Sequence, residues 1–76
     1  MFSLNKIVKD DILEICFSNN DTESKMYSIT DTKGNTIMQG KITGHTQRTC
    51  LFVGDLKKGA YTFTLGKDHI QEFTIQ

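Results

Sequence analysis

The chain has 76 residues, with nine basic and nine acidic side chains and therefore no net charge. Because no basic stripe is available to neutralise phosphates, nucleic acid is a poor candidate partner. No apolar run approaches the roughly 18 residues that span a bilayer, so we expect no membrane span. The length suits one small domain over residues 1–76. The first residues lack the apolar core and cleavage site of a signal peptide.

The residue types favour an all-β fold. Proline is absent, threonine is abundant, and Ile, Val, Phe and Tyr supply much of the apolar content. These residues fit a pleated, half-buried surface. Seven short strands are expected over residues 5–9, 12–17, 25–30, 36–42, 48–53, 60–65 and 69–75.

Turn residues separate these strands. Asp31 and Gly34 enclose a tight hairpin, because the Asp side chain caps such a turn and Gly accepts a positive φ. In the returning strand Ile37 and Ile42 differ in parity, so both face the core only if a bulge intervenes. We expect that bulge at Gly40.

The strands start mostly about 9 to 13 residues apart, which is typical of an immunoglobulin-like antiparallel β-sandwich. In that fold the second and fifth strands are neighbours in one sheet. A corner at Leu56, Gly59 and Tyr61 precedes the sixth strand and is placed like a tyrosine corner. The alternative is an ordinary aromatic packed in a strand. Phe63 stands where antibody domains keep a cysteine of their central disulfide.

The hairpin Asp31-Thr32-Lys33-Gly34, the corner Leu56-Lys57-Lys58-Gly59-Ala60-Tyr61 and the final strand Phe73-Thr74-Ile75 together carry a family resemblance. The chain resembles the C-terminal sorting domains of the type IX (Por) secretion system. It resembles equally a related family of small periplasmic domains of unknown function. The first resemblance implies a folded export signal at the end of a larger cargo protein. The second implies a stand-alone module.

Sorting domains usually open with an asparagine–proline pair and end with a lysine-bearing strand. This chain has no proline, and residues 71–76 contain no lysine. These departures favour the stand-alone family. Our leading interpretation is therefore a non-catalytic, immunoglobulin-like module of the bacterial cell envelope, periplasmic or secreted, which acts in structure or protein interaction. A type IX sorting domain is the first alternative.

A carbohydrate-binding or adhesin module is the second alternative. Such a site needs exposed aromatic side chains, and the chain has no Trp. Phe52 and Phe2 are the candidates.

No catalytic, cofactor or metal site is expected. His45 and His69 stand alone, without a nucleophile or paired-ligand spacing. The acidic residues at 10–11 and 19–23 lack the ligand spacing of a calcium loop. Cys16 and Cys50 fall on neighbouring strands, and both a cross-strand disulfide and free thiols remain open. Two cysteines without a second pair or a nearby His make no zinc site.

Four apolar side chains are expected on the outer face of the second and fifth strands: Ile12, Cys16, Cys50 and Phe52. An exposed apolar patch of this kind is a candidate partner surface. Its occupant would be a protein partner, a domain of a parent protein or a homodimer mate. The alternative is that the first segment or a loop covers it.

Overall fold

The computed structural model describes residues 2–17, 25–42, 48–66 and 69–76. Within these ranges the chain forms strands and no helix, which confirms the all-β prediction. The strands are β1 (Phe2–Leu4), β2 (Ile7–Val8), β3 (Ile12–Phe17), β4 (Lys25–Thr30), β5 (Thr36–Ile42), β6 (Arg48–Phe52), β7 (Gly59–Leu65) and β8 (His69–Ile75). This part of the chain accordingly offers no helix that could cross a membrane.

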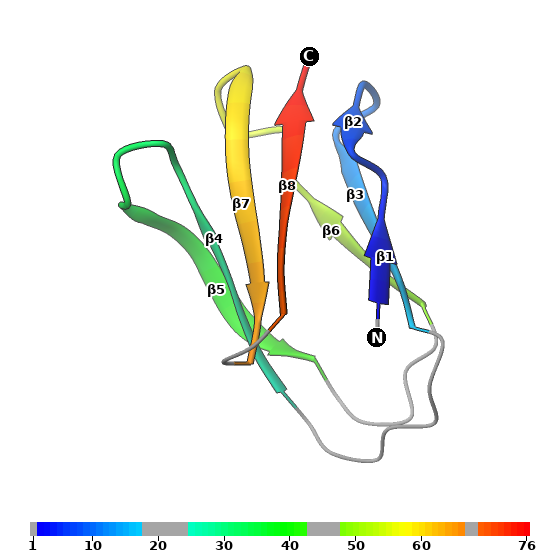
Figure 1. Ribbon diagram of the computed structural model, residues 1–76. Helices are drawn as coiled ribbons and strands as arrows, with labels where there is room; N and C mark the ends of the chain where they lie inside the picture. The colour runs from blue at the N-terminus through cyan, green and yellow to red at the C-terminus, as the bar shows by residue number, and fades with distance from the viewer. Residues whose placement is uncertain (1, 18–24, 43–47, 67–68) are drawn as a thin grey trace.

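The strands form two sheets packed as a sandwich (Figure 1). One sheet has the order β1-β3-β6 and the other has the order β2-β8-β7-β4-β5. Neighbours are antiparallel except β2 and β8, which run parallel. The expected pairing of the second and fifth predicted strands is confirmed, because Leu13 of β3 lies opposite Leu51 of β6.

The core lies between the sheets and is centred on Phe63. Every second residue of β7 is buried, as a half-buried strand requires, and Phe63 has no exposed surface. Its ring stacks on Tyr27 of β4 at 5.8 Å and meets Phe2 of β1 edge-on at 5.4 Å. Full burial of such a ring contributes about 1.5–3 kcal/mol. One aromatic side chain therefore joins strands of both sheets.

The N-terminal segment differs from the prediction of one edge strand over residues 5–9. It forms two short strands, β1 and β2, which belong to different sheets. After β1 the chain crosses over, and the backbone carbonyl of Lys6 accepts a hydrogen bond from the Thr74 N–H at 2.8 Å. Three and two residues are too few to show an alternating pattern, so periodicity could not separate the strands. The described strands therefore number eight rather than seven.

The predicted bulge exists, but its expected position at Gly40 is wrong. The register between β4 and β5 shifts between Ile29 and Thr30, which leaves Ile37 as the extra residue. Gly40 instead lies opposite Tyr27, where an added Cβ would come within 2.8 Å of the ring atom Cε2. Gly40 is needed for the room it leaves to an aromatic ring. Because the register is unbroken from Met38 to Ile42, Ile37 keeps the opposite parity to the buried Ile42 and faces solvent.

The hairpin between β4 and β5 is built on Asp31. Its backbone carbonyl accepts the Gly34 N–H at 3.1 Å, and its Oδ1 accepts the N–H groups of Lys33 and Asn35, each at 2.9 Å. Gly34 has φ of +86°, as the predicted turn required. The hydrogen bond from the Asn35 backbone is the main reason that the pKa of Asp31 is lowered.

Candidate interaction surface

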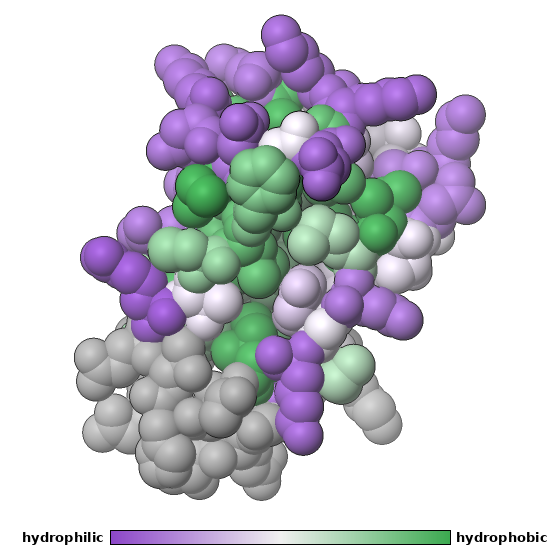
Figure 2. All heavy atoms as spheres, turned by 180° about the vertical axis from the view of Figure 1, so that it is seen from behind, coloured by the Kyte–Doolittle hydropathy of each residue, from purple (hydrophilic) through white to green (hydrophobic). Residues whose placement is uncertain are grey.

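The outer face of β3 and β6 carries the four apolar residues of the predicted partner surface. Ile12 lies opposite Phe52, and this pair forms one end of the face. Phe52 is 58% exposed and Cys50 is exposed, whereas Ile12 and Cys16 are half-buried. The Phe52 ring folds over Gly54, where a Cβ would lie 2.5 Å from the ring carbon Cζ. Figure 2 shows hydrophobic residues across the middle of the molecule seen from behind, flanked by hydrophilic ones.

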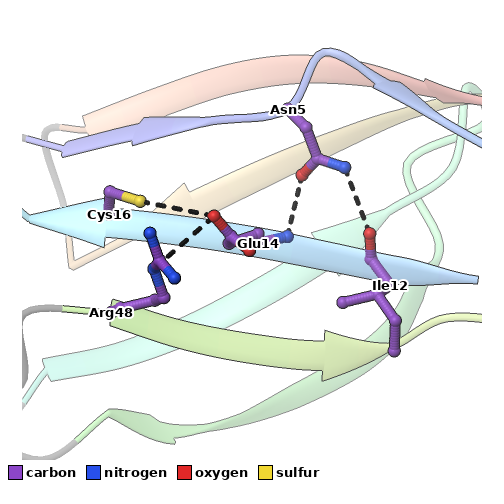
Figure 3. A network of polar contacts seen from close by, with 5 residues as sticks. All are labelled: Asn5, Ile12, Glu14, Cys16 and Arg48. Atoms are coloured by element: carbon purple, nitrogen blue, oxygen red, sulfur yellow. Dashed lines mark hydrogen bonds and ion pairs between the residues drawn. The ribbon is translucent and has the colours of Figure 1, made fainter.

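A polar cluster interrupts these apolar residues (Figure 3). Arg48 Nε lies 3.5 Å from Glu14 Oε1, and the Cys16 thiol donates to the same oxygen at 3.8 Å. The hydrogen bond with Cys16, followed by the charge of Glu14, raises the pKa of Arg48. The face is thus apolar at the Ile12 end and charged at the other end, rather than one continuous apolar patch.

The two cysteines are free. Cys16 lies opposite Arg48, and Cys50 lies opposite Glu14, so the register sets the cysteines two residues apart along the strands. Of the two alternatives that the sequence left open, the structure has the free thiols.

The first segment does not lie over this face. β1 extends the same sheet beside β3, with Ser3 opposite Cys16. The two segments at 18–24 and 43–47, which include the predicted loops, lie outside the described residues.

The corner residues lie at the start of β7. The Tyr61 hydroxyl donates a 2.6 Å hydrogen bond to the Lys57 backbone carbonyl, four residues earlier. Leu56 packs against the core, and Gly59 has φ of +146°, a backbone conformation that side chains disfavour. The Tyr61 ring stacks on Phe73 of β8 at 5.7 Å. This corner therefore holds the crossover between the sheets against β7.

The sequence reasoning missed Asn5. Its side-chain Oδ1 accepts the Glu14 N–H at 2.8 Å, and its Nδ2 donates to the Ile12 carbonyl at 3.1 Å (Figure 3). The Asn5 side chain thus supplies the hydrogen bonds to β3 that a further backbone residue of β1 would have made. It does so where the chain leaves β1 for the other sheet. An Asn between two short apolar stretches is the one local signal for this role.

Residues with potential for chemistry are dispersed. His69 is half-buried at the start of β8 and lies edge-on to Phe2 at 6.0 Å. The described residues contain no group of three His, Cys, Asp or Glu that could hold a metal ion. His45 and the acidic segment 19–23 lie outside the described residues.

Phe2 was named as a candidate for carbohydrate stacking, and this is wrong. It is 5% exposed and belongs to the core. Phe52 is the one Phe or Tyr among the exposed large hydrophobic side chains of the described part.

Comparison with known protein families identifies the family of this chain. The model of the secretion system C-terminal sorting domain matches residues 9–75. The chain belongs to this family. The resemblance to sorting domains is therefore confirmed. Searches of curated proteins and of solved structures returned no match.

The sorting-domain match begins at residue 9, so β1 and β2 precede it. These two strands nevertheless pair with β3 and β8 and place Phe2 in the core. In this sorting domain the sandwich therefore extends beyond the matched region at its N-terminal side.

Proposed function

We propose that the chain is the folded sorting signal of a cargo protein of the type IX secretion system. The observation that carries this proposal is the family match over residues 9–75. In this role the chain catalyses no reaction and acts as part of a larger parent protein. The parent protein is secreted or displayed on the cell surface.

The architecture supports a signal that is read as a folded object. The strands that make up the sandwich come from the whole described chain, and its N-terminal part meets the last strand, since β2 pairs with β8. A short linear motif would need none of this packing. We therefore place the recognised features on the surface of the sandwich rather than in one segment.

The family match favours this role over our leading interpretation from sequence, a stand-alone envelope module. The chain lacks the asparagine–proline pair and a lysine in residues 71–76, yet the family model matches residues 9–75. These departures therefore do not take the chain out of the family.

Export of a reporter tests the proposal. A fluorescent protein that carries a secretory leader is fused in front of the chain and produced in a bacterium with type IX machinery. We expect the reporter outside the cells or on their surface, and in the periplasm of a strain that lacks the machinery. A stand-alone module would instead leave the reporter in the periplasm of both strains, which would contradict the proposal.

Two controls separate folding from recognition. Phe63→Ala removes the centre of the core and should lower stability by about 3–5 kcal/mol, so that export fails together with folding. Thr62→Ser, on the opposite side of the same strand, should leave both unchanged. Export of the unfolded Phe63→Ala fusion would show that a linear segment, not the sandwich, is recognised.

A further inference from the structure

The described sheets have four edge strands, β1 and β6 in one sheet and β2 and β5 in the other. Open edges pair with strands of other chains unless they are short, bulged or charged with lysine. β1 and β2 have three and two residues, and β5 carries the Ile37 bulge and Lys41. β6 has five residues, no register shift against β3, and neither lysine nor proline. Its one charge, Arg48, lies at its first residue and is paired with Glu14, so β6 is the least protected of the four edges.

The hydrogen bonds of Asn5 show which way the backbone groups of β3 point. In an antiparallel sheet, alternate residues direct their N–H and C=O groups to opposite neighbours. The Ile12 carbonyl and the Glu14 N–H are bonded to Asn5, on the β1 side. The backbone groups of Leu13 and Ile15 therefore point toward β6.

The open edge of β6 follows from this parity. Leu13 and Ile15 lie opposite Leu51 and Thr49, so these two residues of β6 use their N–H and C=O groups on β3. The same groups of Arg48, Cys50 and Phe52 point the other way. The outer edge of β6 therefore presents the unpaired N–H and C=O groups of three alternate residues, with Cys50 at the centre.

We propose that β6 pairs with β6 of a second copy of this chain. The two strands run antiparallel about a two-fold axis at Cys50, and the two three-stranded sheets become one continuous sheet. Arg48, Cys50 and Phe52, whose backbone N–H and C=O groups point away from β3, then each face one of the same three residues in the second copy. Each such pair exchanges two hydrogen bonds. Because three residues of β6 direct their backbone groups outward, the middle one, Cys50, lies at the two-fold axis.

The side chains agree with this pairing. Arg48 faces Phe52 of the second copy, and Cys50 faces Cys50. The Arg48 and Phe52 side chains are 67% and 58% exposed, so a guanidinium resting on a ring covers both. Arg48 also keeps its ion pair with Glu14 on its own sheet. No two like charges meet across the axis.

One strand pair buries less than the roughly 1,200 Å² of a standard stable interface, so the dimer is weak and forms with rising concentration. Disulfide cross-linking can therefore detect this weak dimer and report which residues face each other. Residues that form a hydrogen-bonded antiparallel pair have Cα atoms about 5.5 Å apart, which lies within the about 4.4–6.8 Å that a disulfide spans.

Diamide oxidation of the Cys16→Ser variant is the first test. Cys50 remains as its single thiol, and the expected product on a non-reducing gel has twice the mass of the chain. The matched Cys50→Ser variant keeps only the half-buried Cys16 and should stay at the mass of one chain. Absence of the Cys50 product at every concentration would overturn the proposal.

The register is tested in a background that carries Cys16→Ser and Cys50→Ser. Arg48→Cys alone and Phe52→Cys alone should not cross-link, because each would face the other position. A mixture of the two variants should cross-link readily. Equal cross-linking of the single variants and the mixture would indicate random collision and would overturn the paired register.

Removal of the edge donor tests the backbone pairing without a disulfide. Cys50→Pro lacks the N–H at the axis, whereas Cys50→Ser keeps it, and proline is tolerated where an edge N–H faces solvent. In sedimentation experiments the Ser variant should associate like the parent, and the Pro variant should stay monomeric with its fold intact. Cys50→Lys, which sets two like charges opposite each other, serves if the Pro variant fails to fold. Equal association of the Ser variant and a folded Pro or Lys variant would contradict the inference, whatever the outcome of the export experiment.

Discussion

The side-chain amide of Asn5 accepts the backbone N–H of Glu14 at 2.8 Å and so continues the pairing of β1 with β3 by one further step. Beyond this point the backbone departs to join β8 in the other sheet. One side chain thus allows the N-terminal segment to belong to both sheets, because it satisfies the strand that the backbone leaves.

Asn5→Ala should lower the free energy of unfolding by about 1–3 kcal/mol, because two part-buried backbone groups lose their partners. Chemical denaturation measures the loss, and faster hydrogen exchange of the Glu14 amide locates it. Asn5→Asp can accept from Glu14 but cannot donate to Ile12, so we expect an intermediate value. An alanine variant as stable as the parent would show that water replaces the amide at no cost.

Tyr61→Phe should lower the free energy of unfolding by about 0.5–1.5 kcal/mol. The substitution removes the hydroxyl that donates a 2.6 Å hydrogen bond to the Lys57 carbonyl, and it leaves the ring in place. Tyr27→Phe is the matched control, since the Tyr27 ring also packs on the core and its hydroxyl has no hydrogen-bond partner among the described residues. Thermal and denaturant unfolding of both variants give the comparison. A Tyr61 loss no larger than that of the control would contradict a structural role for the corner.

Gly40→Ala should destabilise the protein by about 1–3 kcal/mol, because the new methyl group would lie 2.8 Å from the Tyr27 ring. In a Tyr27→Ala background the same change should cost much less, so a double-mutant cycle should show coupling between the two positions. Additive losses would mean that the backbone of β5, rather than the ring, requires glycine.

The Asp31 carboxylate should make stability depend on pH. Its pKa is lowered from 3.8 by hydrogen bonds from Asn35 and Lys33 in the folded state. A lowered folded pKa means that the charged form stabilises the fold above the unfolded pKa, and that this contribution disappears as pH falls through the folded value. Asp31→Asn should therefore unfold more easily than the parent near neutral pH, and the two melting temperatures should converge in acid. Nuclear magnetic resonance titration of the Asp31 carboxyl gives the folded pKa directly.

Features with a local physical cause were visible in the sequence. The Asp31 and Gly34 pair predicted the hairpin, and alternation in β7 predicted the buried row that contains Phe63. The spacing of Leu56, Gly59 and Tyr61 pointed to the crossover. In each case neighbouring residues carry both the pattern and its cause.

Features that depend on distant partners were not visible. The bulge at Ile37 is a feature of the register between β4 and β5, and the need for glycine at position 40 comes from the Tyr27 ring on the neighbouring strand. The offset of Cys16 from Cys50 depends on the register of β3 with β6, which no single strand encodes. The partner surface was predicted as four apolar residues, and the charged pair between them is likewise a product of that register.

The order of the strands in space has a consequence for how the protein is made. β8 follows the other described strands along the chain, yet it lies between β2 and β7 inside its sheet. The ribosome therefore delivers an inner strand of this sheet after its neighbours, and until then β2 has no partner to pair with. A nascent chain that lacks residues 69–75 is missing an inner strand of the five-stranded sheet rather than an edge strand. The folded sandwich thus marks a polypeptide whose translation has run through β8.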